Sequence, residues 1–200
     1  ITEDTSSTNV VDTAVTDTDD RTGTDTAQAP FTIRPLEVFT EASKSIQPSS
    51  ILEFAGSDAN VSLSGKVTEN STVGSNQLVI TDPAVVPSTF FQNFTIDSIN
   101  PTDVAACTTM TVRYWSTSQG AWVELPGAVD LAGPINGFTA AIPAAIQTDL
   151  GGIQFDIRPA AGANCPTLLP PGFTALPNLG IVLRPGVDVG DDPVTFTNVV

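Results

Sequence analysis

The 200-residue chain contains no histidine and only seven lysines and arginines, against 22 aspartates and glutamates. Its formal net charge at pH 7 is therefore −15. Nucleic-acid binding needs a basic surface, and an anionic membrane surface repels an acidic protein, so the composition argues against both classes of partner. Without histidine, and with only two cysteines, the chain also has no histidine-based catalytic triad and no ordinary zinc site.

Long hydrophobic runs are also missing. Crossing a bilayer takes roughly 20 apolar residues, and the longest candidate, Phe138–Ile146, is shorter and contains Pro143. The chain starts at Ile1 without a signal peptide, which we interpret as a mature protein or an excised fragment. We expect no insertion into a membrane.

Motifs typical of conventional enzymes are absent as well. The sequence has no glycine-rich phosphate loop and no nucleophile elbow. No spacing marks Glu53, Asp58 or Asp156 as the paired carboxylates of a glycosidase. We therefore expect that the protein is not an enzyme. No cofactor is expected either, with calcium as the one candidate.

The two cysteines, Cys107 and Cys165, lie far apart and do not form a CxxC motif. In an acidic, threonine-rich chain this favours one disulfide formed in an oxidising compartment. In the chain-entropy model, closing a loop of this length lowers the entropy of the unfolded chain and thereby stabilises the folded state by about 4 kcal/mol. The alternative is a pair of buried free thiols. A disulfide predicts an extracellular protein, either secreted in a filament or held at the cell surface.

Proline and glycine recur throughout the chain, and β-branched residues dominate between them. This pattern predicts many short strands and an all-β sandwich with long Pro/Gly-rich loops. One or two helical turns fit residues 143–150. The predicted strands lie near residues 10–16, 25–33, 36–46, 59–67, 76–82, 89–98, 107–115, 121–125, 136–142, 152–158, 179–184 and 193–200.

One hairpin is predicted at the level of single residues, between positions 107 and 125. Pairing Trp115 with Trp122 places Arg113 opposite Glu124 on the solvent side. The other face is then expected to be core and consists of Val112, Tyr114, Val123 and Leu125. Two neighbouring tryptophans can stack on a sugar ring, although such a pair also stabilises a hairpin without any ligand.

The two ends of the chain share a short sequence. Thr-Asn-Val-Val occurs at Thr8–Val11 and again at Thr197–Val200, each time after an acidic segment. This placement is typical of a tandem repeat excised out of frame. The alternative is a secreted subunit in which the match is coincidental.

Several motifs resemble those of a known family. A Lys-Ser dipeptide precedes a Pro-Ser turn in Ala42–Ser50, Thr-Asp-Pro ends Leu78–Pro83, and an asparagine lies in the closing segment Phe196–Val200. A closing hairpin rich in Thr and Asp occurs at the N-terminal end, in Val10–Ala27. Together these segments resemble the Ig-like repeat domain of bacterial and archaeal extracellular surface proteins. Residues 100–190 match this pattern least.

The resemblance implies an Ig-like sandwich body at residues 36–200 that lacks its final strand. Residues 1–35 would be a donor strand or closing hairpin, exchanged between subunits to complete the sandwich. Repeated head to tail, this exchange makes an open homopolymer. The alternative is a disordered acidic tail. The expected donor residues are Asn9, Val10, Val11, Ala14, Val15, Phe31 and Ile33.

The resemblance also implies a self-ligation. Some surface Ig-like domains join a lysine on the first strand to an asparagine on the last strand, next to a buried carboxylate. Lys44 matches the lysine and Asp82 the carboxylate, whereas the asparagine would be Asn198 of the same module or Asn9 of a donated strand. The alternative is that Lys44 extends to solvent at an edge and Asp82 caps a proline turn.

An acidic turn offers oxygen ligands for a metal. Asp17, Asp19, Asp20 and Asp25 are close in sequence, although the segment departs from the EF-hand pattern and contains Arg21. Calcium binding is one interpretation, and a solvated hairpin tip that opposes lateral aggregation is the other.

Three triplets have the form of N-glycosylation acceptors, at Asn60, Asn70 and Asn93. Such triplets also arise by chance in a chain rich in serine and threonine.

These observations lead to one main hypothesis of function. We expect a structural subunit or repeat of an extracellular filament or cell-surface stalk, assembled head to tail by β-strand donation. The alternative is a surface adhesin that binds glycan or another surface through Trp115, Trp122 and nearby loops. A third option is a non-catalytic module attached to a secreted enzyme.

Overall fold

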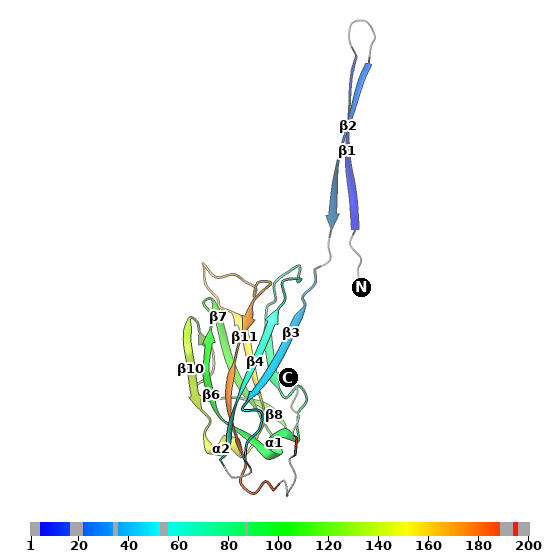
Figure 1. Cartoon of the computed structure of the whole chain (residues 1–200). Coiled ribbons are helices and arrows are strands. Elements are labelled where there is room, and N and C mark those ends of the chain that lie inside the picture. Colours follow the sequence, from blue (N-terminus) through cyan, green and yellow to red (C-terminus); the bar gives the residue numbers. More distant parts are fainter. Residues whose placement is uncertain are drawn as a thin grey trace. The chain divides into compact units, whose positions relative to one another are not determined.

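The computed structural model describes residues 5–16, 22–33, 36–52, 56–86, 88–188 and 194–195. The chain divides into two compact units, Ile1–Glu37 and Val38–Val200 (Figure 1). Each unit has its own hydrogen-bonded strands.

The N-terminal unit contains one antiparallel hairpin. Strand β1 (Thr5–Thr16) pairs along its whole length with β2 (Thr22–Ile33), from Thr5 opposite Ile33 to Thr16 opposite Thr22. Valine and threonine, which recur in β1, and the threonines of β2 favour extended backbone. The predicted donor residues therefore lie on two strands that pair with each other within one chain.

The second unit is a β-sandwich, as the strand pattern predicted. One sheet has six strands in the order β10-β6-β13-β4-β12, with β3 also paired to β4, and the other has the order β5-β11-β7-β8, with β9 also paired to β7. The strands of the first sheet are β3 (Thr40–Gln47), β4 (Asp58–Val67), β6 (Phe94–Val104), β10 (Ile135–Ala141), β12 (Thr174–Ala175) and β13 (Asn178–Leu183). Those of the second are β5 (Leu78–Asp82), β7 (Thr108–Ser116), β8 (Ala121–Glu124), β9 (Leu131–Ala132) and β11 (Leu150–Pro159).

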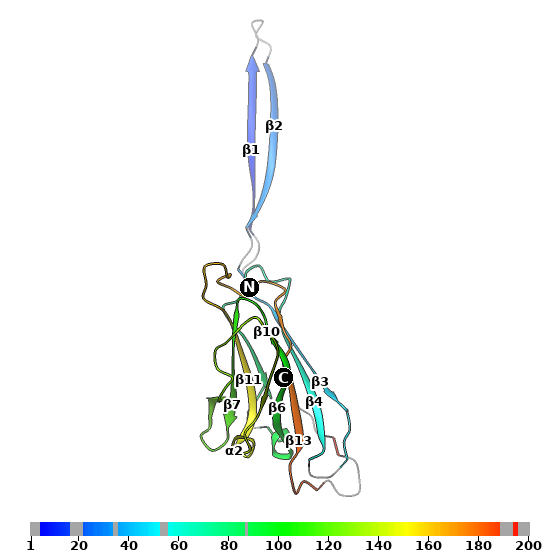
Figure 2. The same cartoon turned by 90° about the vertical axis from the view of Figure 1, so that its left-hand side faces the viewer.

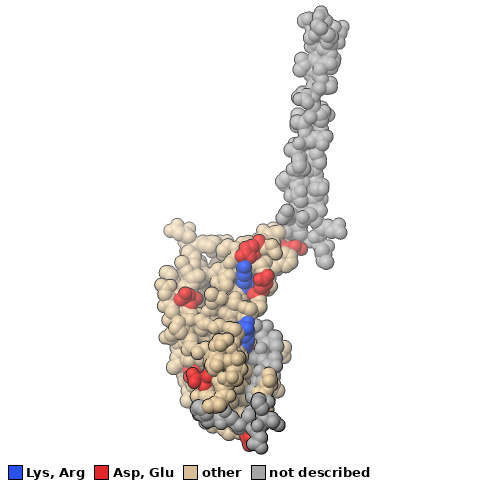
Figure 3. Space-filling view, in the orientation of Figure 1, with Lys and Arg blue, Asp and Glu red and all other residues tan. Residues whose placement is uncertain are grey.

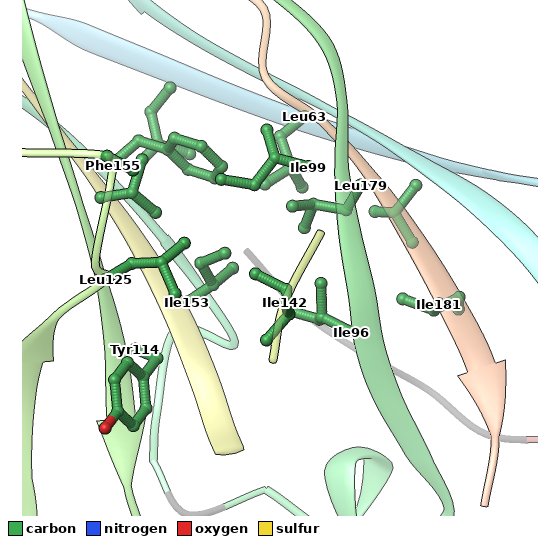
Figure 4. Close-up of a cluster of buried hydrophobic side chains, with 14 of the residues drawn as sticks. Leu63, Ile96, Ile99, Tyr114, Leu125, Ile142, Ile153, Phe155, Leu179 and Ile181 are labelled. Carbon is green, nitrogen blue, oxygen red and sulfur yellow. The ribbon is translucent and has the colours of Figure 1, made fainter. Parts of the chain in front are cut away.

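The two sheets face each other in the sandwich (Figure 2). Alternating residues of both sheets meet between them in one hydrophobic core (Figure 4). In β4, for example, exposed and buried residues alternate, so Val61 and Leu63 point inward. Phe155 of β11 and Leu179 of β13 are completely buried in the same cluster. Burying a side chain of this size contributes about 1.5–3 kcal/mol.

The predicted hairpin and disulfide are both confirmed. Trp115 pairs with Trp122 and Arg113 with Glu124 in the β7–β8 ladder, and Val112, Tyr114 and Leu125 are buried on the other face. Cys107 and Cys165 form a disulfide with a Cα–Cα distance of 5.2 Å. The alternative of two free thiols is therefore wrong.

The structure differs from the sequence-based expectation at the start of β6. The predicted strand 89–98 begins with a helical turn, α1 (Phe90–Asn93), and extended backbone starts at Phe94. Phe90 and Phe91 are both buried, which suits a helical turn because consecutive residues of a strand point to opposite faces. The expected short helix is present as α2 (Ala144–Gln147). Most of the predicted strand 193–200 lies outside the described residues.

Candidate functional site

Two facing strand edges define the candidate site. Among the described strands, β3 pairs with β4 alone, because β13 and β12 pair with the other side of β4. In the second sheet, β5 pairs with β11 alone among the described strands. Lys44 lies on β3 and Asp82 ends β5, so this pair bridges the two sheets at their edges.

Lys44 and Asp82 form a short, buried ion pair. The Lys44 Nζ atom lies 2.6 Å from Oδ1 and 2.7 Å from Oδ2 of Asp82. Their side chains are only 7% and 1% exposed. Alternation along β3 explains the burial of Lys44, since this residue and Ile46 are the less exposed positions of the strand. The ammonium group therefore lies inside the sandwich, away from solvent.

Aromatic side chains form one wall of this site. The Lys44 Nζ atom lies 5.5 Å from the centre of the Phe90 ring. Phe90 is 3% exposed and stacks on Phe94 with ring centres 4.6 Å apart. Phe90 was not predicted as a site residue, because Lys44 and Phe90 are distant in the sequence and meet only in the folded chain. The only signal for it in the sequence was the Phe-Phe doublet that begins α1.

Burial changes the protonation equilibrium of the lysine. Loss of hydration lowers the pKa of Lys44, and the attraction of the Asp82 carboxylate opposes this effect without cancelling it. The free-energy cost of removing two charges from water can equal the gain from their attraction. A buried ion pair is therefore weak evidence for a stabilising role. A lysine with a lowered pKa next to a specific carboxylate is a candidate for chemistry.

The two predicted asparagines are placed differently. Asn198 lies outside the described residues. Asn9 lies on β1 in the N-terminal unit, where the structure describes the backbone only. Of the four predicted ligation residues, the structure thus brings together Lys44 and Asp82.

A groove of about 420 Å³ runs between the edges of β3 and β5. Thr40, Glu41 and Ala42 line it from β3, and residues 77–81 line it from the β5 side. Gly65 of β4 also lines the groove, and a Cβ atom at this position would lie 2.5 Å from the Ile80 side chain. The groove is therefore bounded by backbone edges and by closely packed apolar side chains.

The predicted glycan site consists of two tryptophans that meet edge to face. The ring centres of Trp115 and Trp122 are 5.6 Å apart, with an interplanar angle of 72°. The neighbouring Arg113 is bonded to Asp156 at 2.8 Å and lies 3.8 Å from Glu124. The tryptophans thus do not form one flat platform for a sugar, and the adjacent charges pair with each other.

The predicted calcium ligands come from residues 17–25 of the sequence. Asp17, Asp19 and Asp20 are outside the described residues, and only the backbone of Asp25 is described, on β2. Across the part of the chain that the structure describes, no group of three or more His, Cys, Asp or Glu side chains is placed to hold a metal ion.

The three glycosylation triplets differ in their surroundings. Asn60 is exposed on β4 and accepts a hydrogen bond from the side chain of Asn100. Asn93 is half-buried and donates to the Thr89 carbonyl at 3.1 Å. Asn70 is exposed in the turn after β4.

Within the described residues, no helix is long and apolar enough to cross a membrane. Comparisons with protein-family models, with curated proteins and with solved structures found no match to this chain.

Proposed function

We propose that the protein is an Ig-like structural module of an extracellular filament or cell-surface stalk. In this proposal, copies join head to tail by donating a β-strand, and a covalent bond at Lys44 locks the junction. The observation that carries the proposal is the buried Lys44–Asp82 pair between two strand edges. A mechanical role fits this arrangement because a covalent cross-link withstands a pulling force that would unfold a marginally stable domain.

The groove between β3 and β5 supports the strand-donation step. Edge strands offer unpaired N–H and C=O groups to an added strand, and alternating pockets select its side chains. The segment Thr8–Val11 is a candidate for the added strand because it combines an asparagine with two valines. The copy of this sequence at Thr197–Val200 is the candidate within the same chain.

The proposed ligation is an amide exchange. Proton transfer from Lys44 to Asp82 yields a neutral amine, which the apolar surroundings favour. The amine attacks the side-chain carbonyl carbon of an asparagine while the Asp82 carboxyl group donates a hydrogen bond to the carbonyl oxygen. The new C–N bond replaces the bond to the amide nitrogen, and Asp82 relays the amine proton to the leaving ammonia.

Truncation separates the two candidate functions. Deleting residues 1–35 removes the proposed donor, so we expect filaments in electron micrographs of the full chain and single particles for the truncated chain. Trp122→Ala is the matched variant and should leave filaments intact. If truncation leaves assembly unchanged and Trp122→Ala abolishes binding to immobilised glycans, the filament proposal is wrong and the adhesin alternative is favoured.

A further inference from the structure

A second concave site is lined by residues of α1 and by residues beside α2. Figure 1 shows these two helical turns at the same end of the sandwich. This pocket has a volume of about 350 Å³. Its polar lining includes Arg184, which directly follows β13. Ser88 and Gln92 line the pocket at α1, and Thr117 and Thr148 line it beside the start of β11. Its apolar lining includes Phe91 and Leu150, which are both buried.

Three backbone carbonyl groups hold the Arg184 side chain in place. Its Nε atom donates to the carbonyl oxygens of Phe91 and Phe94, each at 3.0 Å. Its Nη2 atom donates to the Leu150 carbonyl at 3.2 Å. A guanidinium group has five N–H donors, so this arrangement fixes its position and leaves further donors for a ligand.

Arg184 differs from the other basic side chains that the structure describes. Each of the others pairs with a carboxylate: Lys44 with Asp82, Lys66 with Glu69, and Arg113 and Arg158 with Asp156. Among the described residues, Arg184 has carbonyl partners and no carboxylate partner. Figure 3 shows few basic side chains among the described residues on this face, in keeping with the seven lysines and arginines of the whole chain.

The electrostatics of the pocket favour an anion. Burial lowers the pKa of Arg184, and within the described part of the chain no carboxylate offsets the loss of hydration. The nearby Asp149 is bonded to Ser116, Thr117 and Ser118 and does not line the pocket. An incoming carboxylate would restore the missing countercharge through charge-assisted hydrogen bonds.

We propose that this pocket binds a carboxylate group through Arg184, with Ser88 and Gln92 as further donors. The Ser88 hydroxyl suits this role because its oxygen accepts a bond from the Phe90 N–H, which leaves its hydrogen for a ligand. The carboxylate is that of a small free acid or that of an aspartate or glutamate on a second copy of this acidic chain. The proposal does not depend on the ligation at Lys44.

The test is an NMR titration that follows the arginine Nε–Hε signals of the full chain. Sodium acetate replaces sodium chloride at constant ionic strength, so that general screening does not change. We expect the Arg184 signal to shift and saturate, while the signals of Arg113 and Arg158 stay in place. Ser88→Asp puts a competing carboxylate at the rim and should abolish the shift, whereas the uncharged Ser88→Asn should preserve it.

A second arm identifies the source of the carboxylate. Raising the protein concentration without acetate should shift the same signal if a second copy supplies the group, and should leave it unchanged if a free acid does. The inference is overturned if acetate moves all arginine signals linearly without saturation. It is equally overturned if Ser88→Asp and Ser88→Asn respond alike to acetate.

Discussion

Asp149 shows how one carboxylate can organise a turn. Its oxygens accept bonds from the hydroxyls of Ser116 and Thr117 at 2.5 and 2.8 Å and from the Ser118 N–H at 2.7 Å. These donors stabilise the ionised form and lower its pKa to about 2. No local pattern indicates this role, because Asp149 lies 31 residues beyond Ser118 of the β7–β8 turn that it caps.

The lowered pKa predicts how stability responds to acid. Since the folded chain holds the proton more weakly than the unfolded chain, the contribution of Asp149 is present above the usual aspartate pKa of 3.8 and disappears as the pH falls towards about 2. A carbon-detected NMR titration should place the Asp149 midpoint near 2. A midpoint near 3.8 would contradict the capping role, and Asp149→Asn should lose this part of the acid dependence.

The chain's two lysines provide a matched comparison. Lys44→Met leaves the buried Asp82 carboxylate without its ammonium partner, which we expect to cost about 3–5 kcal/mol of the free energy of unfolding. Lys66→Met removes an ion pair at the surface, with side chains 28% and 68% exposed, and should cost far less. Denaturant titration measures both, and equal losses would show that the Lys44–Asp82 pair has no special role.

At the scale of elements, Gly65 determines how closely β4 and β5 approach. Because an added Cβ atom would lie 2.5 Å from the Ile80 side chain, Gly65→Ala should destabilise the sandwich by about 1–3 kcal/mol through overpacking. Ile80→Val removes one methyl group from that contact and should recover part of the loss in the double variant. A double-mutant cycle by chemical denaturation checks this, and strictly additive losses would contradict the proposed contact.

Elements with clear alternation could be predicted from the sequence, and elements fixed by packing could not. The register of β7 and β8 followed from alternating residues around Trp115 and Trp122. The helical turn α1 did not, because the two phenylalanines that begin it also suit a strand. The contact of Phe90 with Lys44 joins residues distant in sequence, so no local pattern indicates it.

At the scale of the whole molecule, the disulfide links two cysteines that are 58 positions apart and so closes a long loop of the sandwich. Cys107 precedes β7, and Cys165 lies between β11 and β12. Replacing both cysteines with alanine should lower the free energy of unfolding by about 4 kcal/mol, because the unfolded chain regains loop entropy. Thermal unfolding with and without reductant checks this. Identical midpoints for the wild-type chain and the double variant would contradict the assigned contribution.

The most direct test of the central proposal is the intact mass of the boiled, denatured, non-reduced protein, read beside a denaturing gel. We predict a ladder of multimers, each lighter by one ammonia per junction, with Lys44 bonded to Asn9 of a neighbouring copy. A monomer lighter by one ammonia would instead place the bond within one chain, at Asn198, and Lys44→Met should abolish either product. A monomer at the sequence mass, less only the two hydrogens of the disulfide, would contradict ligation at Lys44.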